Sequence, residues 1–244
     1  MYILVSNDDG FDSRGITLLA AVAREFGDTR IVAPDRQQSA ASHALSLHRP
    51  LRAWQVKPEV WAVDGTPTDC VNLAVNGLLD GRPDLIVSGI NHGANLGDDI
   101  TYSGTVAAAM EGCLLGIPAL AFSFDNFLGA GIDECVAPLR KILGWCLQNL
   151  PESGTLYNIN FPEDIAASRG VRITEQGRRV YGDAMVSCMD PRGRPYYWIG
   201  GNVLRSEPTP RSDIQAVADG YISLTPINLD LTDRQVLLKL QDCL

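Results

Sequence analysis

Asp8 and Asp9 are adjacent acidic residues that follow a short apolar run, Tyr2–Ser6, near the start of the chain. Two neighbouring carboxylates repel one another unless a cation or a hydrogen-bonding turn offsets their charge. Hard divalent ions such as Mg²⁺ and Mn²⁺ take oxygen ligands from carboxylates, hydroxyls and amide carbonyls. The pair therefore indicates a divalent-metal site, and the alternative is a turn whose backbone groups bind the two side chains.

Two further polar loops follow apolar runs of the kind that forms strands buried on both faces. Ser39 lies in the loop after Arg30–Ala33, and Asn91 lies in the loop after Asp84–Ser88. Ligands of open α/β sheets bind outside the carboxyl ends of the strands, so we expect these loops to converge at one edge. There Ser39 and Asn91 can add neutral oxygens to the two carboxylates.

Ser103, Gly104 and Thr105 open a predicted helix that is rich in alanine, Thr105–Leu115. A helix N-terminus offers unpaired N–H groups and the positive end of the macrodipole, and glycine lets a ligand approach the backbone. This suits a phosphate group, although Ser103 can equally be an ordinary N-cap. A divalent ion beside a phosphate-binding helix would make a phosphoryl-transfer site, built from electrostatics and positioning.

Other polar residues near these loops have both a catalytic and a structural interpretation. His92 or His43 could protonate a leaving alkoxide, or be a hydrogen-bonded structural residue. Asp98 and Asp99 could approach a second metal, or cap and solvate their loop. Four arginines form a basic stretch that could contact substrate phosphates, or belong to a solvent-exposed hairpin or a subunit interface. They are Arg178, Arg179, Arg192 and Arg194. Aromatic side chains could stack on a base or pack in the core: Tyr102, Phe11 and Tyr196–Trp198.

The elements that must position these residues alternate along the first part of the chain. Apolar runs predict strands at Tyr2–Ser6, Arg30–Ala33, Asp84–Ser88 and Ala119–Phe122. Helical spacing of apolar residues predicts helices at Ile16–Phe26, Thr68–Leu79, Thr105–Leu115 and Cys135–Leu150. This alternation implies βαβ units and an α/β fold with a largely parallel sheet and flanking helices.

From about Gly170 the pattern changes to short strands separated by turns rich in glycine and proline. We expect an antiparallel extension and a final helix that begins after Thr232 with a capping-box pattern. The expected strands are Val171–Thr174, Val180–Val186, Tyr196–Ile199 and Tyr221–Leu224. We therefore expect a single α/β domain over residues 1–244, with a core over 1–165 that carries the active site and a β-rich extension over 170–244.

Composition narrows the class of protein. The chain has 244 residues, is 45% hydrophobic and carries a formal net charge of −9, which disfavours a role in binding duplex nucleic acid. No apolar run reaches the ~18–20 residues of a membrane span, and the N-terminus lacks the features of a signal peptide. The six cysteines show no paired spacing and are expected to be reduced, so we expect a cytoplasmic protein without a membrane role.

Several long motifs, in order along nearly the whole chain, resemble the SurE (survival protein E) family of 5′/3′-nucleotidases. The motifs are Ile3–Gly10, Val32–Arg36 with Ser39, Gly65–Val71, Val87–Asn91 with Gly93, and Tyr102–Val106, with shorter matches at Asn158–Pro162, Tyr197–Gly200 and Gly220–Pro226. One departure is Ala94, where the family usually has proline, which makes that loop less rigid. The stretch Phe124–Glu134 and the region around Met185–Met189 match no pattern that assigns them a role.

The resemblance implies a Rossmann-like fold and a metal-dependent phosphomonoesterase. It would be a hydrolase that cleaves nucleoside 5′-monophosphates, with 3′-monophosphates and short polyphosphate as further substrates. It implies one divalent ion per subunit, Mg²⁺ or Mn²⁺, and a homodimer or homotetramer assembled by exchange of C-terminal elements. The residues that it implies are Asp8, Asp9 and Asn91 as catalytic, Asp8, Asp9, Ser39 and Asn91 as metal ligands, and Asn7, Ser103, Gly104 and Thr105 as phosphate contacts.

Three points stay open at the level of sequence. The nucleophile could be water or the carboxylate of Asp8. The chain could bind a nucleotide as a regulatory module without turnover, although a pure binder has little need of a full set of oxygen ligands. A Rossmann dehydrogenase lacks support because no glycine-rich dinucleotide motif follows the first strand.

Overall fold

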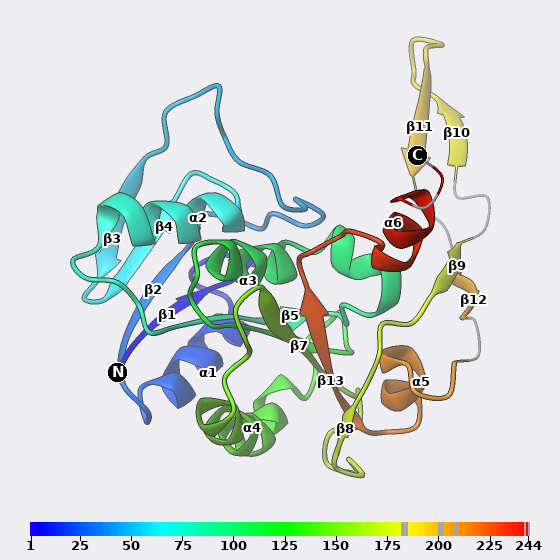
Figure 1. Cartoon of the computed structure of the whole chain (residues 1–244). Coiled ribbons are helices and arrows are strands. Elements are labelled where there is room, and N and C mark those ends of the chain that lie inside the picture. The colour runs from blue at the N-terminus through cyan, green and yellow to red at the C-terminus, as the bar shows by residue number, and fades with distance from the viewer. Residues whose placement is uncertain (182–184, 200–202, 207–208, 242, 244) are drawn as a thin grey trace.

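The computed structural model describes residues 1–181, 185–199, 203–206, 209–241 and 243. Within this part of the chain, nine strands form one sheet in the order β3-β4-β2-β1-β5-β6-β7-β13-β8 (Figure 1). The six strands from β4 to β7 in this order are mutually parallel, and β3 and β13 run antiparallel to β4 and β7. The predicted α/β class with a largely parallel sheet is confirmed. The strands are β1 (Tyr2–Ser6), β2 (Asp28–Pro34), β3 (Ala53–Lys57), β4 (Val60–Val63), β5 (Leu85–His92), β6 (Ala119–Phe124), β7 (Thr155–Phe161), β8 (Val171–Ile173) and β13 (Ile222–Asn228).

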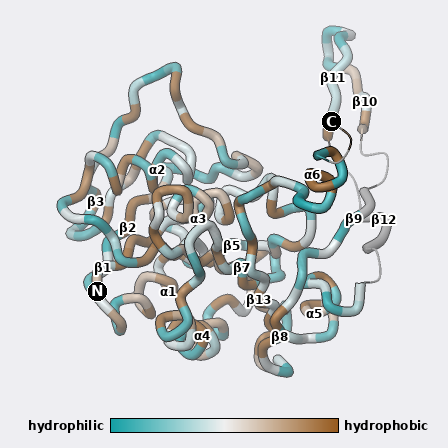
Figure 2. The backbone as a smooth tube through the Cα atoms, viewed as in Figure 1, coloured by the Kyte–Doolittle hydropathy of each residue, from teal (hydrophilic) through white to brown (hydrophobic). Residues whose placement is uncertain are grey.

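Helices cover both faces of this sheet, as Figure 1 shows. Ile3 and Val5 belong to the core beneath α1 and α4, whereas Leu4 between them packs in the core beneath α2 and α3. Because the central strands are buried on both faces, their sequences are continuous apolar runs rather than alternating ones. Figure 2 shows these hydrophobic segments gathered in the central strands and the adjoining helices. The helices are α1 (Arg14–Ala23), α2 (Pro67–Leu73), α3 (Gly104–Leu114) and α4 (Val136–Gln148).

The order of the strands reverses at β1, which has β2 on one side and β5 on the other. The chain leaves β1 for β2 and β4, then returns to β5 on the opposite side. The loops after β1 and β5 therefore leave the sheet in opposite directions and open a crevice between them. This topology brings the loop that contains Asp8 next to the end of β5, which contains Asn91.

The helix predicted over Thr68–Leu79 differs from the observed one in its second half. It begins at Pro67 with a reciprocal capping box between Thr66 and Asp69, as the sequence suggests. After Leu73 the chain widens into a π-helical turn, η1 (Ala74–Leu78), in which Leu79 N donates to Ala74 O at 3.4 Å. Apolar spacing alone does not distinguish this wider turn from a continued α-helix.

Strand β7 was not expected from the sequence, because Asn158 and Asn160 interrupt its apolar pattern. Both asparagines are fully buried, and their side chains bind a loop next to the candidate site, as described below. The edge strand β3, its neighbour β4 and the short helix α5 (Asp213–Ala218) were also not expected. β3 is largely exposed, so it lacks a clear apolar signature.

The β-rich extension is continuous with the central sheet. β13 pairs antiparallel with β7, and β8 pairs parallel with β13. The strand expected over Val180–Val186 consists of two strands, β9 and β10, and residues 182–184 between them lie outside the described part. The remaining strands form two antiparallel pairs, β9 (Arg179–Tyr181) with β12 (Val203–Ser206) and β10 (Met185–Met189) with β11 (Pro195–Ile199).

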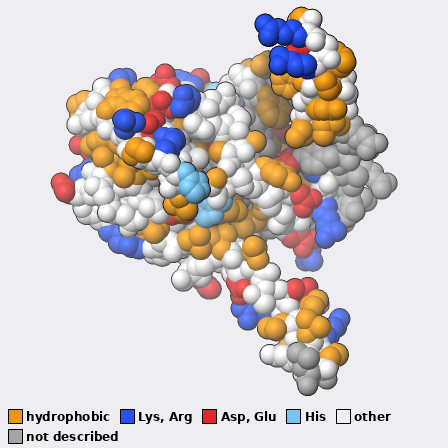
Figure 3. Space-filling view, turned by 90° about the horizontal axis from the view of Figure 1, so that it is seen from above, with side chains coloured by type: hydrophobic (Ala, Val, Ile, Leu, Met, Phe, Trp, Pro, Cys, Tyr) orange, Lys and Arg blue, Asp and Glu red, His pale blue; other side chains and the backbone are white. Residues whose placement is uncertain are grey.

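Two C-terminal arms, the β10–β11 hairpin and α6 (Arg234–Gln241), expose hydrophobic side chains. Figure 3 shows such side chains on parts that project from the body. Helix α6 has no buried residue among those that are described. The six cysteines are free thiols, four of them buried, and no helix in the described ranges is long and apolar enough to cross a membrane.

Candidate active site

A pocket of about 320 Å³ lies at the crevice beside β1 and β5. Its lining includes all four predicted metal ligands, although they come from three separate segments: the turn after β1, the loop after β2 and the end of β5. Cavities of this size suit small-molecule ligands. The lining residues are Asp8, Asp9, Gln37, Ser39, Ala40, Asn91, His92, Ala94, Asn95, Asp99, Tyr102, Ser103 and Phe127.

Asp8 is buried at the end of β1, facing the N-terminus of α3. The Thr105 hydroxyl donates a hydrogen bond to Asp8 Oδ1. A Cβ atom on Gly104 would lie 2.7 Å from Asp8 Cβ, so only glycine allows the helix to approach this closely. The first turn of α3 is therefore directed at the carboxylate of Asp8, where the helix dipole favours its charge.

The electrostatics of the acidic pair favour a bound cation. Burial, with a smaller contribution from the charge of Asp9, raises the pKa of Asp8 to about 6, and the hydrogen bond from Thr105 acts against this shift. Burial also raises the pKa of Asp9, while His92 acts to lower it. Raised pKa values mean that two desolvated carboxylates lack sufficient positive charge nearby, and a divalent ion would supply it.

The donor set fits a hard cation rather than zinc. Among the residues that the structure describes, no group of three or more His, Cys, Asp or Glu side chains is placed to hold a metal ion. The pocket instead combines two carboxylates with the hydroxyl of Ser39 and the amide of Asn91. Such mixed oxygen sets suit Mg²⁺ and Mn²⁺.

Ser39 belongs to the long loop over residues 35–52, which several contacts fasten to the body. Gln38 N donates to Asp8 O at 2.8 Å, and Ser42 Oγ donates to Thr101 O at 2.7 Å. His43 Nε2 donates to Glu111 Oε2 at 2.8 Å, and Glu111 is a buried residue of α3. The structure therefore supports the structural interpretation of His43.

Asn91 and His92 end β5 at the floor of the pocket. Asn91 Nδ2 donates to Gly93 O at 2.7 Å, so Oδ1 is the side-chain atom suited to bind a cation. His92 N donates to Asp9 Oδ2 at 3.2 Å, which links the two loops. His92 Nε2 is buried without a hydrogen-bond partner among the described residues, and its imidazole lines the pocket.

Of the predicted phosphate contacts, Ser103 lines the pocket and Asn7 lies in the turn after β1. Ser103 lines the pocket and is the N-cap of α3, with Oγ accepting from Val106 N at 3.1 Å. Asn7 does not line the pocket. Its Nδ2 donates to Gly10 O at 2.9 Å and to Ser13 Oγ at 2.8 Å. These bonds hold the turn after β1, and the role of Asn7 as a phosphate contact stays a prediction.

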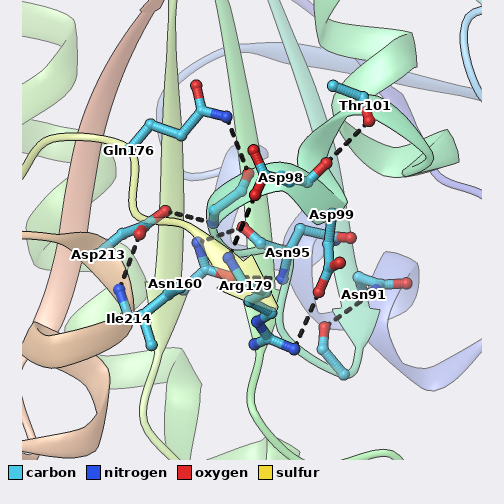
Figure 4. Close-up of polar contacts among 12 residues, drawn as sticks. Asn91, Asn95, Asp98, Asp99, Thr101, Asn160, Gln176, Arg179, Asp213 and Ile214 are labelled. Atoms are coloured by element: carbon cyan, nitrogen blue, oxygen red, sulfur yellow. Dashed lines mark hydrogen bonds and ion pairs between the residues drawn. The ribbon is translucent and has the colours of Figure 1, made fainter. Parts of the chain in front are cut away.

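Asp99 lies on the rim of the pocket and pairs with Arg179 from the extension (Figure 4). Arg179 NH1 lies 2.9 Å from Asp99 Oδ2, and Arg179 N donates to Asp98 Oδ2 at 3.2 Å. Asp213 adds a second tie, because its Oδ2 accepts from Gly97 N and its Oδ1 from Gly177 N, both at 2.9 Å. The segment η2 (Gly97–Thr101) is therefore fastened to the extension, which the sequence did not predict.

These contacts favour the structural interpretations of the other charged residues. Asp98 and Asp99 hold the extension rather than forming a separate acidic cluster. Farther out, Arg194 Nε donates to Asp190 Oδ2 at 3.0 Å within the β10–β11 hairpin, and Arg192 N donates to Asp190 Oδ1 at 2.8 Å. These two arginines belong to the exposed hairpin and not to the pocket lining.

A buried amide network fixes the loop that follows β5, and sequence reasoning missed it. Asn95 N donates to Asn160 Oδ1 at 2.8 Å, and Asn95 Nδ2 donates to Ser123 Oγ at 2.7 Å. Asn158 Nδ2 donates to Asn95 O at 2.8 Å. Buried amides that are hydrogen-bonded in this way hold a backbone rigidly. The only signal in the sequence was the pair of asparagines inside an otherwise apolar run.

The fold and the site together define a class: a Rossmann-like α/β protein with desolvated, paired carboxylates next to a helix N-terminus at the sheet's topological switch point.

Comparison with known proteins places the chain within this class. A family model described as "Survival protein SurE" matches residues 3–183. The chain is 51% identical to the "5'-nucleotidase SurE" of Gemmatimonas aurantiaca, with 97% of this chain and 96% of that protein covered. It is also 51% identical to the protein of the same name from Syntrophotalea carbinolica, covering 96% and 93%. The chain belongs to the SurE family, so the resemblance seen in the sequence is confirmed.

A solved structure agrees with the whole fold. The crystal structure of the SurE protein from Aquifex aeolicus superposes with a TM-score of 0.88 at 38% sequence identity. The match covers 100% of this chain and 99% of that one.

Proposed function

We propose that this protein is a divalent-metal-dependent phosphomonoesterase that hydrolyses nucleoside 5′-monophosphates to nucleoside and phosphate. Nucleoside 3′-monophosphates and short polyphosphate are further candidate substrates. The observation that carries the proposal is the desolvated pair Asp8 and Asp9, which shares one pocket with the N-cap of α3. The names of the curated relatives, "5'-nucleotidase SurE", support the same substrate class.

One divalent ion per subunit, Mg²⁺ or Mn²⁺, would be held by the oxygens that the pocket collects from Asp8, Asp9, Ser39 and Asn91. When bound, such an ion neutralises phosphoryl charge and makes water a better nucleophile at neutral pH. The residues fit this role because their own charges are poorly compensated within the protein. Asp8, Asp9 and Asn91 are the residues to which we assign catalysis.

The chain's own groups would orient the substrate. The Ser103 hydroxyl and the first backbone N–H groups of α3, at Gly104 and Thr105, can donate to phosphoryl oxygens at the positive end of the helix. His92 lines the pocket and is the candidate to protonate the departing nucleoside oxygen, but its Nε2 is buried next to Gly129 and would have to turn toward the substrate.

We favour water over the Asp8 carboxylate as the nucleophile. The side chain of Asp8 is already held by Thr105 and lies against Gly104, so it is positioned for charge compensation rather than attack. A phosphorylated Asp8 recovered by rapid quench would contradict this assignment.

The C-terminal arms suit a homodimer or homotetramer assembled by exchange of C-terminal elements. Both arms expose several large apolar side chains, and such exposure is unfavourable in water unless a partner covers them. They include Tyr197, Trp198, Ile199, Leu237, Leu238 and Leu240.

The test is phosphate release from a panel of nucleoside monophosphates with Mn²⁺, with Mg²⁺ and with excess EDTA. We expect metal-dependent release that Asp8→Asn abolishes, because the variant removes half of the carboxylate charge of the pair. Asp12→Asn is the matched control, since Asp12 is an exposed aspartate of the same loop. Near-normal activity of Asp8→Asn, or release that survives EDTA, would refute the proposal.

A further inference from the structure

Phe127 is an exposed aromatic residue on the rim of an otherwise polar pocket. Its side chain is 83% exposed, yet it lines the same pocket as Asp8 and Asp9. It lies in the stretch between β6 and α4, for which the sequence motifs gave no assignment. Single exposed apolar side chains are common on protein surfaces, so the feature that points to a ligand is the position of this ring beside the polar groups of the pocket.

The ring is held in place although it is exposed. A Cβ atom on Gly93 would lie 2.6 Å from Phe127 Cε1, so the ring rests directly on the backbone next to Asn91. Asn126 fixes the turn: its Oδ1 accepts from Leu128 N at 3.0 Å and its Nδ2 donates to Glu163 Oε1 at 3.0 Å. The phenyl ring is thus presented by an organised turn.

Tyr102 is the second ring on this rim. It is 63% exposed and directly precedes Ser103, the N-cap of α3. Its backbone oxygen accepts from Ser42 N at 3.1 Å, which ties it to the loop that contains Ser39. The other aromatic residues considered from the sequence are elsewhere. Phe11 packs against the core, and Tyr196–Trp198 lie on the β10–β11 hairpin.

The two rings flank a pocket whose inner residues suit a phosphate and a metal ion. A phosphate bound at Ser103 leaves the rest of a nucleotide directed to the rim, where a planar base needs an apolar surface. Base stacking on an aromatic side chain tolerates any base, because every base has a π-face.

We propose that Phe127, with Tyr102 on the adjoining rim, receives the nucleobase of the substrate and sets the preference for nucleotides over base-free phosphomonoesters. This inference rests on the proposed nucleotidase function and deepens it. Since stacking strength grows with the area of the ring, purine nucleotides benefit more than pyrimidine nucleotides.

Phe127→Leu tests the proposal, because leucine keeps an apolar side chain and removes the ring. We expect its KM for AMP to rise about tenfold with little change in kcat, and its KM for ribose 5-phosphate to stay constant. Phe127→Tyr is expected to restore the KM for AMP. The matched control is Leu128→Ala, since Leu128 is 92% exposed on the same turn but does not line the pocket.

The outcomes separate this inference from the proposed function. If wild type hydrolyses both substrates and Phe127→Leu raises both KM values equally, or neither, the base-stacking role is wrong. If wild type releases no phosphate from either substrate, the proposed function fails. AMP binding measured by calorimetry then decides the inference, with about tenfold weaker binding expected for Phe127→Leu. If Phe127→Leu and Leu128→Ala both change the elution volume on size exclusion, a second copy of the chain covers the turn and the inference is overturned.

Discussion

Arg179 reaches from the β-rich extension to Asp99 on the rim of the candidate active site, with 2.9 Å between NH1 and Oδ2. Both side chains are about four-fifths buried, at 19% and 22% exposure. The guanidinium therefore offsets a carboxylate that would otherwise add negative charge to a pocket that must admit an anion. The extension is in this way part of the site's electrostatics, and not only a peripheral attachment.

Arg179→Met should weaken the binding of anionic substrates. The variant keeps an apolar stem but leaves Asp99 with less compensation near Asp8 and Asp9. We expect the KM for a nucleoside monophosphate to rise about tenfold, which corresponds to about 1.4 kcal/mol. Steady-state kinetics at several salt concentrations measures this, because added salt screens the extra repulsion and reduces the effect.

Two variants control this experiment. Arg178→Met removes the exposed neighbouring arginine and should leave KM near the wild-type value. Adding Asp99→Asn to Arg179→Met should recover part of the lost affinity, because the carboxylate charge that Arg179 offsets in the wild type is then gone. If the double variant is as impaired as the single one, repulsion by Asp99 is not the cause.

Asp8→Asn should stabilise the metal-free protein at neutral pH while it abolishes turnover. Burial raises the pKa of Asp8 from 3.8 to about 6, so ionisation costs more in the folded than in the unfolded state. Between pH 3.8 and about pH 6 the folded state binds more protons at Asp8 than the unfolded state does. The stability contributed by protonated Asp8 is therefore lost as the pH rises through this range. At pH 8 we expect Asp8→Asn to be about 2 kcal/mol more stable than wild type in EDTA.

Urea denaturation at pH 5 and at pH 8 measures this difference. At pH 5 Asp8 is largely protonated in the folded protein, so Asp8→Asn should raise the free energy of unfolding by less than it does at pH 8. Mn²⁺ should raise the unfolding midpoint of wild type and not that of Asp8→Asn. Equal gains at both pH values would mean that the stabilisation does not come from the charge of Asp8.

His43→Ala should lower the affinity for the metal ion by loosening the loop that contains Ser39. The hydrogen bond from His43 lowers the pKa of Glu111, so the pair joins this loop to a charged group on α3. We expect the Kd for Mn²⁺ to rise about threefold to tenfold, measured by calorimetry. His43→Gln, which can still donate to Glu111, should bind nearly as well as wild type.

His48→Ala is the control for this change, because His48 is an exposed histidine of the same loop. It should leave the Kd for Mn²⁺ unchanged. A similar weakening in His48→Ala would point to a general effect on the loop rather than to the contact with Glu111.

Deleting residues 232–244 should lower the oligomeric state. This segment contains α6, whose exposed leucines Leu237, Leu238 and Leu240 have an apolar surface without cover in the single chain. Size-exclusion chromatography with light scattering measures the mass of wild type and of the truncated chain. An unchanged mass would rule out assembly through this helix.

Much of the site could be predicted from the sequence because its signals are local. Asp8 and Asp9 stand next to a strand, and the apolar runs identify strands buried on both faces. Since the carboxyl ends of parallel strands meet at one edge, the loops with Ser39 and Asn91 could be expected to converge on the acidic pair. Their placement around one pocket agrees with that reasoning. The N-cap at Ser103 was readable in the same way, from residue types and spacing.

The tertiary structure alone decided which distant groups meet. Thr105 and Asp8 are 97 residues apart, and Asn95 and Asn160 are 65 apart, yet each pair shares a hydrogen bond. Neither these contacts nor the Arg179–Asp99 pair leaves a local pattern, since each depends on strand order and on how the extension folds back. Asn7 stays a predicted phosphate contact from its position in a motif, and the structure adds that its amide forms hydrogen bonds within the turn. Sequence patterns report the period and capping of single elements, whereas side-chain direction and long-range pairing are set by packing of the whole core.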